Sequence, residues 1–249
     1  AQKQLKIPME IPENYPLADY NFVLGTQCFG AKYKFTDDPF LIEQAKQIRA
    51  MGSNILKITL GKKYYSSYPD MEKDPALTKA ADLLRSNAQY QQVLDMDFKY
   101  YFFWAHTLTG LDWKYGLDEE KRQLFYDEMY DLAEYLLTQY NNTGKMFFIG
   151  NWEGDWILHG LGNRDKTPSP ERIKRMKEWL EIRQQAIDDA KKQVPHTNVD
   201  IFYYVEVNLV KKGMRGEKCI TESILPQLNV DLVSYSSYEA IKKKKSYEE

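Results

Sequence analysis

The chain has 249 residues with a formal net charge of −2, and charged residues make up 28% of it. A chain so close to neutral projects no strong field, so nothing indicates binding to nucleic acid or to an anionic membrane surface. No apolar run approaches the 18 or so residues of a membrane span. The length suits one large domain whose core needs neither a metal nor a disulfide.

The two ends of the chain are predicted to differ from its body. Pro8, Pro12 and Pro16 lie four residues apart, which favours an extended arm over residues 1–20 rather than a helix. Residues 21–249 are then expected to form the folded domain. The basic run at 242–245 is typical of a solvated helix face or a frayed end.

The compartment is predicted from the first residues rather than from the cysteines. The chain opens Ala1-Gln2-Lys3 without an initiator methionine. Cleavage of a signal peptide leaves such a start, which predicts a secreted or periplasmic protein, although an artificially trimmed chain would begin in the same way. Cys28 and Cys219 are able to pair, but two thiols in a chain this long form no disulfide framework.

Strand-like and helix-like segments alternate from residue 22 onward. Apolar runs predict strands over 22–27, 54–60, 100–106, 145–153, 199–208 and 230–236. Capping residues and helical spacing predict helices from Asp38-Pro39 to Gly52, from Asp74-Pro75 through Leu84 to about Val93, from Asp118 to about Asn142, and from Ser169-Pro170 to about Ala190.

This alternation predicts an α/β fold with parallel strands joined by crossover helices. We expect a (β/α)-barrel of the TIM type that is incomplete, because six β/α units are visible and a closed barrel has eight. A six-stranded open sheet is the alternative. No glycine-rich phosphate-binding turn follows the first strand, which disfavours a Rossmann-type sheet.

The end of the fourth strand carries the strongest functional signal. Asn151, Trp152, Glu153 and Asp155 follow an apolar run, and strand alternation would place Asn151 and Glu153 on one side. Parallel α/β domains carry their sites at such strand ends. A tryptophan beside a carboxyl group lowers the local polarity and raises the pKa of the carboxyl, as a general acid requires. The alternative is that Glu153 and Asp155 cap the following turn.

Other strand ends add candidate ligands. Strand five ends in Glu206 and Asn208, and an inward carboxyl among aromatic residues is costly unless it is paired or used. An ion pair with the inward Lys57 of strand two is the alternative to function. Further candidate substrate ligands are His106 after strand three, Tyr235 at the end of strand six and Gln27 at the end of strand one.

Several kinds of site are not indicated. The three histidines, His106, His159 and His196, form no close pair in the sequence, which argues against a His-rich zinc site. The nucleophile elbow, the Walker A pattern and calcium-loop spacing are all missing. We therefore predict no cofactor and no metal.

In strand order, and in the residues Asn151-Trp152-Glu153 and Tyr235, the chain resembles the clan of retaining (β/α)8-barrel glycoside hydrolases. In that clan an adjacent Asn-Glu pair ends strand four, the Asn binding a sugar hydroxyl and the Glu acting as acid/base. A Glu on strand seven is the nucleophile, oriented by a Tyr from strand six. Here Trp152 separates the pair, and no strand seven is visible to supply the nucleophile.

The sequence therefore predicts a glycoside hydrolase that acts on an oligo- or polysaccharide. Glu153 is the expected acid, and its partner is Glu206 or a carboxyl group outside this sequence. Substrate ligands are expected among Asn151, Trp152, His106, Tyr235, Asn208, Asp155, Gln27 and Lys57. The 19 Tyr and 5 Trp suit stacking on sugar rings but also suit a core.

Two other functions remain open at this point. A non-catalytic carbohydrate-binding or scaffold protein on a barrel-derived fold would use the same aromatic surfaces. A different barrel enzyme would use Lys57 as a Schiff-base residue, which requires Lys57 to have no carboxylate partner. The sequence does not indicate an oligomeric state.

Overall fold

A computed structural model describes residues 24–109, 111–160 and 163–241. Its centre is one six-stranded sheet with the strand order β1-β2-β3-β4-β5-β6. The strands are β1 (Gly25–Gln27), β2 (Ile55–Leu60), β3 (Tyr100–Ala105), β4 (Met146–Gly150), β5 (Asp200–Val207) and β6 (Leu232–Tyr235). The arm predicted over residues 1–20 and the basic run at 242–245 lie outside the described residues.

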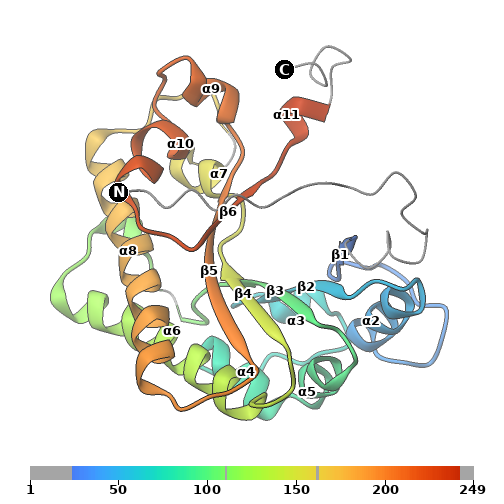
Figure 1. The fold of residues 1–249 in the computed structure, drawn as a ribbon. Helices are drawn as coiled ribbons and strands as arrows, with labels where there is room; N and C mark the ends of the chain where they lie inside the picture. Colours follow the sequence, from blue (N-terminus) through green and yellow to red (C-terminus); the bar gives the residue numbers. More distant parts are fainter. Residues whose placement is uncertain (1–23, 110, 161–162, 242–249) are drawn as a thin grey trace, which may run out of the picture.

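Every pair of neighbouring strands is parallel, as the sequence predicted. Each strand pairs with the next one in the chain, so the sheet grows in one direction and curls into a half-barrel (Figure 1). β1 and β6 are its two edges. The α/β class and the six predicted strands are therefore confirmed.

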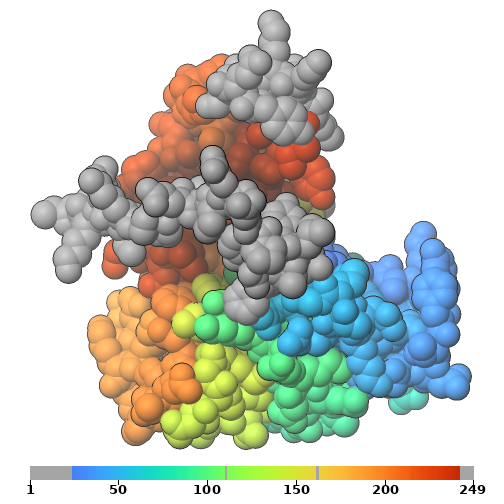
Figure 2. Space-filling model, turned by 45° about the vertical axis from the view of Figure 1, so that its right-hand side comes forward, coloured from blue at the N-terminus to red at the C-terminus, as the bar shows by residue number. Residues whose placement is uncertain are grey.

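The longer helices cover the outer face of the sheet (Figure 1). These are α2 (Phe40–Ala50), α4 (Ala80–Ser86), α5 (Ala88–Asp95), α6 (Glu119–Gln139) and α8 (Pro170–Gln193). The short ones are α3 (Tyr64–Ser67), α7 (Gly154–His159), α9 (Val210–Met214), α10 (Ile220–Ser223) and α11 (Tyr238–Ile241), with 3-10 turns η1 (Trp113–Tyr115) and η2 (Leu225–Gln227). Figure 2 shows the coloured segments following one another around the lower half of the molecule, from blue to orange.

Side-chain caps explain where the two longest helices begin. The carboxylate of Asp118 accepts a hydrogen bond from the Lys121 backbone N–H, and the hydroxyl of Ser169 accepts one from Arg172. Both contacts satisfy an N–H that the first helical turn leaves without a partner. Both predicted starts are confirmed.

Two other predicted starts are wrong. α2 begins at Phe40, and its N-terminal N–H is bound by the distant carboxylate of Asp70 at 2.9 Å rather than by Asp38. The segment opened by Asp74-Pro75 forms turns, and α4 begins only at Ala80. The Asp74 side chain accepts a hydrogen bond from Ala76, two residues on, which is a turn contact and not a helix cap.

The core lies between the sheet and the helices. Alternate side chains of β2, namely Leu56, Ile58 and Leu60, are fully buried against the helical layer, and β3 to β5 repeat this pattern. The intervening side chains face the inner side of the half-barrel, because successive residues of a strand point to opposite faces. This alternation directs the polar side chains of the strands to the inner face.

Cys28 and Cys219 are both free and buried, so the disulfide that the sequence left open does not form. Burial raises the pKa of the Cys28 thiol to about 12. In the three described segments, no helix has both the length and the apolar character required to cross a membrane.

Candidate functional site at the carboxyl ends of the strands

Three strands bring Lys57, Trp104 and Glu206 together on the inner face of the sheet. In β2 the neighbours of Lys57, Leu56 and Ile58, are fully buried on the helix side, so Lys57 points the other way. The same alternation turns Trp104 in β3 and Glu206 in β5 inward. The resulting contacts cross the curled sheet from β2 to β5.

A charged contact network joins these three side chains. Oε2 of Glu206 lies 3.1 Å from Nζ of Lys57 and accepts a hydrogen bond from Nε1 of Trp104 at 3.0 Å. Nζ of Lys57 also lies 4.1 Å from the centroid of the Trp104 ring, a cation–π contact. Glu206 is only 3% exposed, and a buried ion pair needs additional hydrogen bonds such as the one from Trp104. The ion pair expected as one alternative is therefore present, and the Schiff-base hypothesis for Lys57 is wrong.

Glu153 lies near this network and has a raised pKa. Burial is the largest cause, the negative charge of Glu206 adds to it, and the positive charge of Lys57 opposes it. Two carboxyl groups that interact in this way disfavour ionisation of both at once. The raised pKa keeps the Glu153 carboxyl protonated to a higher pH than an ordinary Glu, which is the property a general acid requires.

The backbone of Glu153 is also unusual. Its φ is 27° and its ψ is 76°, at the junction between β4 and α7. Residues with a Cβ atom seldom adopt positive φ, and such conformations cost of order 1–3 kcal/mol. Strained residues of this kind cluster at functional sites.

The predicted alternation at the end of strand four is wrong. β4 ends at Gly150, so the strand pattern does not extend to Glu153. Phe147 and Ile149 are buried on the helix side, and Asn151 is fully buried as well. The Asn151 amide donates to the backbone oxygen of Trp152, while its Oδ1 has no partner among the described residues. Asn151 and Glu153 therefore do not face one ligand together.

Asp155 has a structural environment. It is fully buried, and Oδ2 accepts hydrogen bonds from the backbone N–H groups of Asn208 at 2.7 Å and Leu209 at 2.9 Å. Oδ1 accepts one from Ile220 at 2.8 Å. Both oxygens thus hold the chain that follows β5. The assignment of Asp155 as a substrate ligand is not supported, because its carboxylate has no surface to offer.

Asn208 is held by the carboxylate of Asp155. Its backbone N–H binds Asp155, its side chain is 4% exposed, and its Oδ1 has no partner among the described residues. It lies two positions beyond Glu206 at the end of β5. The structure does not show it contacting Glu206 or Lys57.

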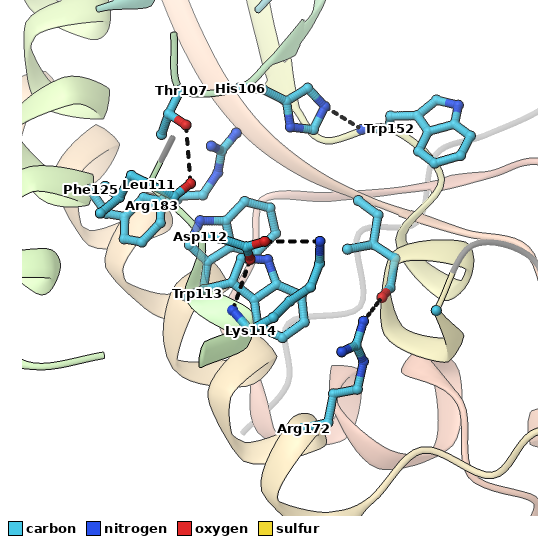
Figure 3. Close-up of a pocket in the computed structure, with 13 residues that line it drawn as sticks. His106, Thr107, Leu111, Asp112, Trp113, Lys114, Phe125, Trp152, Arg172 and Arg183 are labelled. Carbon is cyan, nitrogen blue, oxygen red and sulfur yellow. Dashed lines mark hydrogen bonds and ion pairs between the residues drawn. The ribbon is translucent and has the colours of Figure 1, made fainter. Parts of the chain in front are cut away.

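His106 and Trp152 meet at a separate pocket. Nε2 of His106 accepts a hydrogen bond from the Trp152 backbone N–H at 3.3 Å, and both residues line a pocket bordered by α6 and α8 (Figure 3). Burial lowers the pKa of His106 to about 3, and the positive charges of Arg183 and Lys114 contribute. Lys57, Trp104 and Glu206 are not among the residues that line this pocket.

Tyr235 and Gln27 occupy the two edge strands. Tyr235 pairs with Val207 in the strand register, whose side chain is buried on the helix side, and the Tyr235 hydroxyl donates to Glu239 at 3.1 Å. The residue beside Glu206 is Ser234, which the sequence did not single out. Gln27 pairs with Lys57 in the register, so it shares the inner face with the ion pair.

Trp104 is the member of the network that the sequence did not identify. Its signal was present, because Tyr101 and Phe103 alternate with it and occupy the buried face of β3. An aromatic residue on the other face near the strand end was therefore predictable as part of the site. Phe29, which follows β1, packs on Trp104 with ring centroids 4.9 Å apart. No local sequence pattern predicts that contact.

Comparisons of the chain with models of protein families, with curated proteins and with solved structures found no match. Within residues 24–109, 111–160 and 163–241, no group of three or more His, Cys, Asp or Glu side chains is placed to hold a metal ion. The chemistry of the site is therefore inferred from its own geometry.

Proposed function

We propose that this protein hydrolyses glycosidic bonds at the inner face of the half-barrel, with Glu153 as the general acid. The observation that carries the proposal is the raised pKa of Glu153 beside the Lys57–Glu206 ion pair. The resemblance to retaining (β/α)8-barrel hydrolases supports it, and so does the position of Glu153 after the fourth strand. The assignment of the half-barrel to an incomplete (β/α)-barrel of the TIM type belongs to the same proposal, as does secretion.

Glu153 and Glu206 would have different roles in the hydrolysis. Protonated Glu153 donates its proton to the leaving oxygen as the bond from that oxygen to the anomeric carbon breaks. Glu206 carries its negative charge among Lys57 and Trp104 and stabilises the positive charge that develops on the sugar ring. Water supplies the hydroxyl group that ends on the anomeric carbon, and its second proton restores Glu153 or passes to solvent.

The first experiment tests glycoside hydrolysis and the role of Glu153 as the general acid together. The protein is incubated with a panel of oligo- and polysaccharides, and release of reducing ends is measured for the wild type and for Glu153→Gln. The amide keeps the shape but has no acidic proton, so the rate should fall by about 10²–10⁴-fold. Glu181→Gln, an exposed change of the same type on α8, should keep the full rate. Equal rates for wild type and Glu153→Gln on an unactivated glycoside would contradict the acid assignment.

A second candidate is carbohydrate binding without hydrolysis. The observation that favours it is the engagement of Glu206 by both Lys57 and Trp104, which limits its use as a base. The inner face also carries stacked rings, such as Phe102 on Phe148 with centroids 4.4 Å apart. Saturable oligosaccharide binding by calorimetry, with no reducing ends released after prolonged incubation, would favour this candidate over hydrolysis.

A further inference from the structure

A pocket of about 490 Å³ lies apart from the Glu206 network, at the border between the strand ends and helices α6 and α8. Its wall is built from the loop after β3, the loop after β4 and the inner sides of the two helices (Figure 3). Its lining includes the nitrogen-bearing side chains of His106, Lys114, Arg172 and Arg183, and the rings of Trp113 and Trp179. The proposed acid–carboxylate pair, Glu153 and Glu206, does not line it.

Backbone carbonyls fix two of the cations. Arg183 is 2% exposed and donates to the Tyr203 hydroxyl and to the carbonyls of Ala105 and Gly150. Arg172 donates to two carbonyls in the last turn of α7, those of Ile157 and Leu158. Neither forms an ion pair with a carboxylate of the described residues. Because a guanidinium has five N–H donors, the Nη1 group of each remains available for a ligand.

The nearby acids do not neutralise these charges. Asp112 pairs with Lys114 at 3.2 Å, which accounts for one cation. Glu128 is the other acid close to Arg183, and burial raises its pKa to about 7 although Arg183 opposes the shift. Glu128 is therefore only partly ionised near neutral pH. The two arginines leave the pocket with a positive balance.

Flat apolar surfaces complete the pocket. The rings of Trp113 and Trp179 stack with centroids 5.7 Å apart, and the Arg172 guanidinium lies over the Trp113 ring. Nε1 of Trp179 is buried and makes no hydrogen bond to any described residue. An unpaired buried N–H costs about 1–3 kcal/mol.

We propose that this pocket binds a small organic carboxylate with a flat apolar body. The carboxylate would meet the free N–H groups of Arg172, with Lys114 at the rim, while Arg183 lies beyond the stacked tryptophans, over the Trp179 ring. The body would lie against the tryptophan surfaces, where His106 presents Nδ1, the nitrogen not used by Trp152. A planar fork of donors suits a carboxylate better than a point charge would.

Benzoate is a suitable probe, with benzyl alcohol as the neutral comparator and inorganic phosphate as the anion without an apolar body. We expect benzoate to bind with one site and a Kd of about 1 mM or tighter by calorimetry. It should also quench tryptophan fluorescence, because three of the five tryptophans line the pocket. Equal binding of benzyl alcohol would overturn the role of charge, and equal binding of phosphate would overturn the role of the apolar body.

Two lysine variants test whether benzoate binds in this pocket. Lys114→Gln at the partly exposed rim should weaken benzoate binding by about fivefold, because it removes the rim cation and leaves the negative charge of Asp112 without its partner. Lys177→Gln, on the exposed side of α8, removes the same charge and should leave the Kd unchanged. Circular dichroism of each variant checks that it folds. Absence of benzoate binding to the wild type, or equal Kd values for both variants, would overturn the proposal. No glycoside is used, so the result is separate from that for hydrolysis.

Discussion

Two buried carboxylates near the ends of neighbouring strands have opposite surroundings. Asp155 gives both oxygens to backbone N–H groups, from Asn208, Leu209 and Ile220. Glu206 gives one oxygen to side chains, those of Lys57 and Trp104, and has a second carboxyl group, Glu153, within electrostatic reach. Because backbone donors belong to the fold itself, Asp155 stabilises the fold. Glu206 has the side-chain partners and the nearby carboxyl group that a catalytic carboxylate requires.

The comparison also explains why the sequence did not separate the two carboxylates. Asp155 and Glu153 are two residues apart and follow the same strand, so their local pattern is identical. What distinguishes them is the distant segment at 208–220, which reaches only Asp155.

The largest expected effect on stability comes from removing the carboxylate of Asp155. Asp155→Ala should lower the free energy of unfolding by about 4 kcal/mol, because three buried backbone N–H groups lose their acceptor. Urea unfolding at pH 7 measures it. Glu206→Gln, which keeps an acceptor for Trp104, should cost clearly less. A loss for Glu206→Gln as large as that for Asp155→Ala would erase the distinction between the two.

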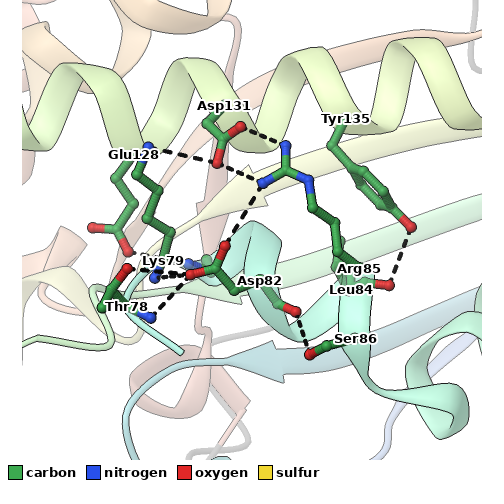
Figure 4. A network of polar contacts seen from close by, with 10 residues as sticks. Thr78, Lys79, Asp82, Leu84, Arg85, Ser86, Glu128, Asp131 and Tyr135 are labelled. Carbon is green, nitrogen blue, oxygen red and sulfur yellow. Dashed lines mark hydrogen bonds and ion pairs between the residues drawn. The ribbon is translucent and has the colours of Figure 1, made fainter. Parts of the chain in front are cut away.

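Glu128 provides an intermediate case. It lies on α6 beside the contacts of Arg85 with Asp131 (Figure 4), and its Oε1 accepts from the Ala80 backbone N–H at 3.2 Å. Burial raises its pKa to about 7, so the folded protein holds this proton more tightly than the unfolded chain does. The contribution of Glu128 to wild-type stability should therefore fall as pH rises from about 4.5 to 7 and level off above that.

Glu128→Gln should remove that dependence. At pH 8 the variant should be more stable than the wild type by about 2 kcal/mol, and at pH 4 the two should be equal. Urea unfolding across this pH range gives the difference. A variant that is less stable than wild type at pH 8 would show that the folded protein needs the Glu128 charge.

The coupling between Lys57 and Glu206 comes next in size. A double-mutant cycle with Lys57→Met and Glu206→Gln should give a coupling energy of about 1–2 kcal/mol, because the pair is largely removed from water. Thermal or urea unfolding of the four proteins supplies the cycle. A coupling near zero would mean that the contact is incidental and that Glu206 is free for another role.

The smallest expected effect concerns the backbone of Glu153. Glu153→Gly should be more stable than Glu153→Ala by about 1 kcal/mol, since glycine accepts positive φ without strain. The matched pair Glu171→Gly and Glu171→Ala, in the first turn of α8, should show the reverse order. If Glu153→Ala were the more stable of its pair, Glu153 would not be strained.

The sheet was predictable because its signal is local. Apolar runs flanked by capping residues located all six strands, and Asp118 and Ser169 located two helix starts. Where a distant residue provides the cap, as Asp70 does for α2, the prediction was wrong. Register also escaped prediction, so Tyr235 was chosen although Ser234 is the neighbour of Glu206.

The site was predictable where strand alternation applies and not beyond it. Lys57 and Glu206 face inward as their strands require, and their ion pair was one of the two expected outcomes. Past Gly150 the chain leaves β4 and Asn151 turns into the core. His106 comes directly after the end of β3 and lines another pocket. The pocket beside α6 and α8 contains two arginines of α8, and the sequence pattern of α8 is that of an ordinary amphipathic helix. The sequence therefore did not predict this pocket.

The central claim, that Glu153 protonates a leaving group, is tested most directly by varying the leaving group. The ratio of the wild-type rate to that of Glu153→Gln is measured for an unactivated glycoside and for the nitrophenyl glycoside of the same sugar. A nitrophenolate leaves without protonation, so the ratio should be about 10²–10⁴ for the first substrate and far smaller for the second. Equal ratios for the two substrates, or a ratio of one for the unactivated glycoside, would contradict the account.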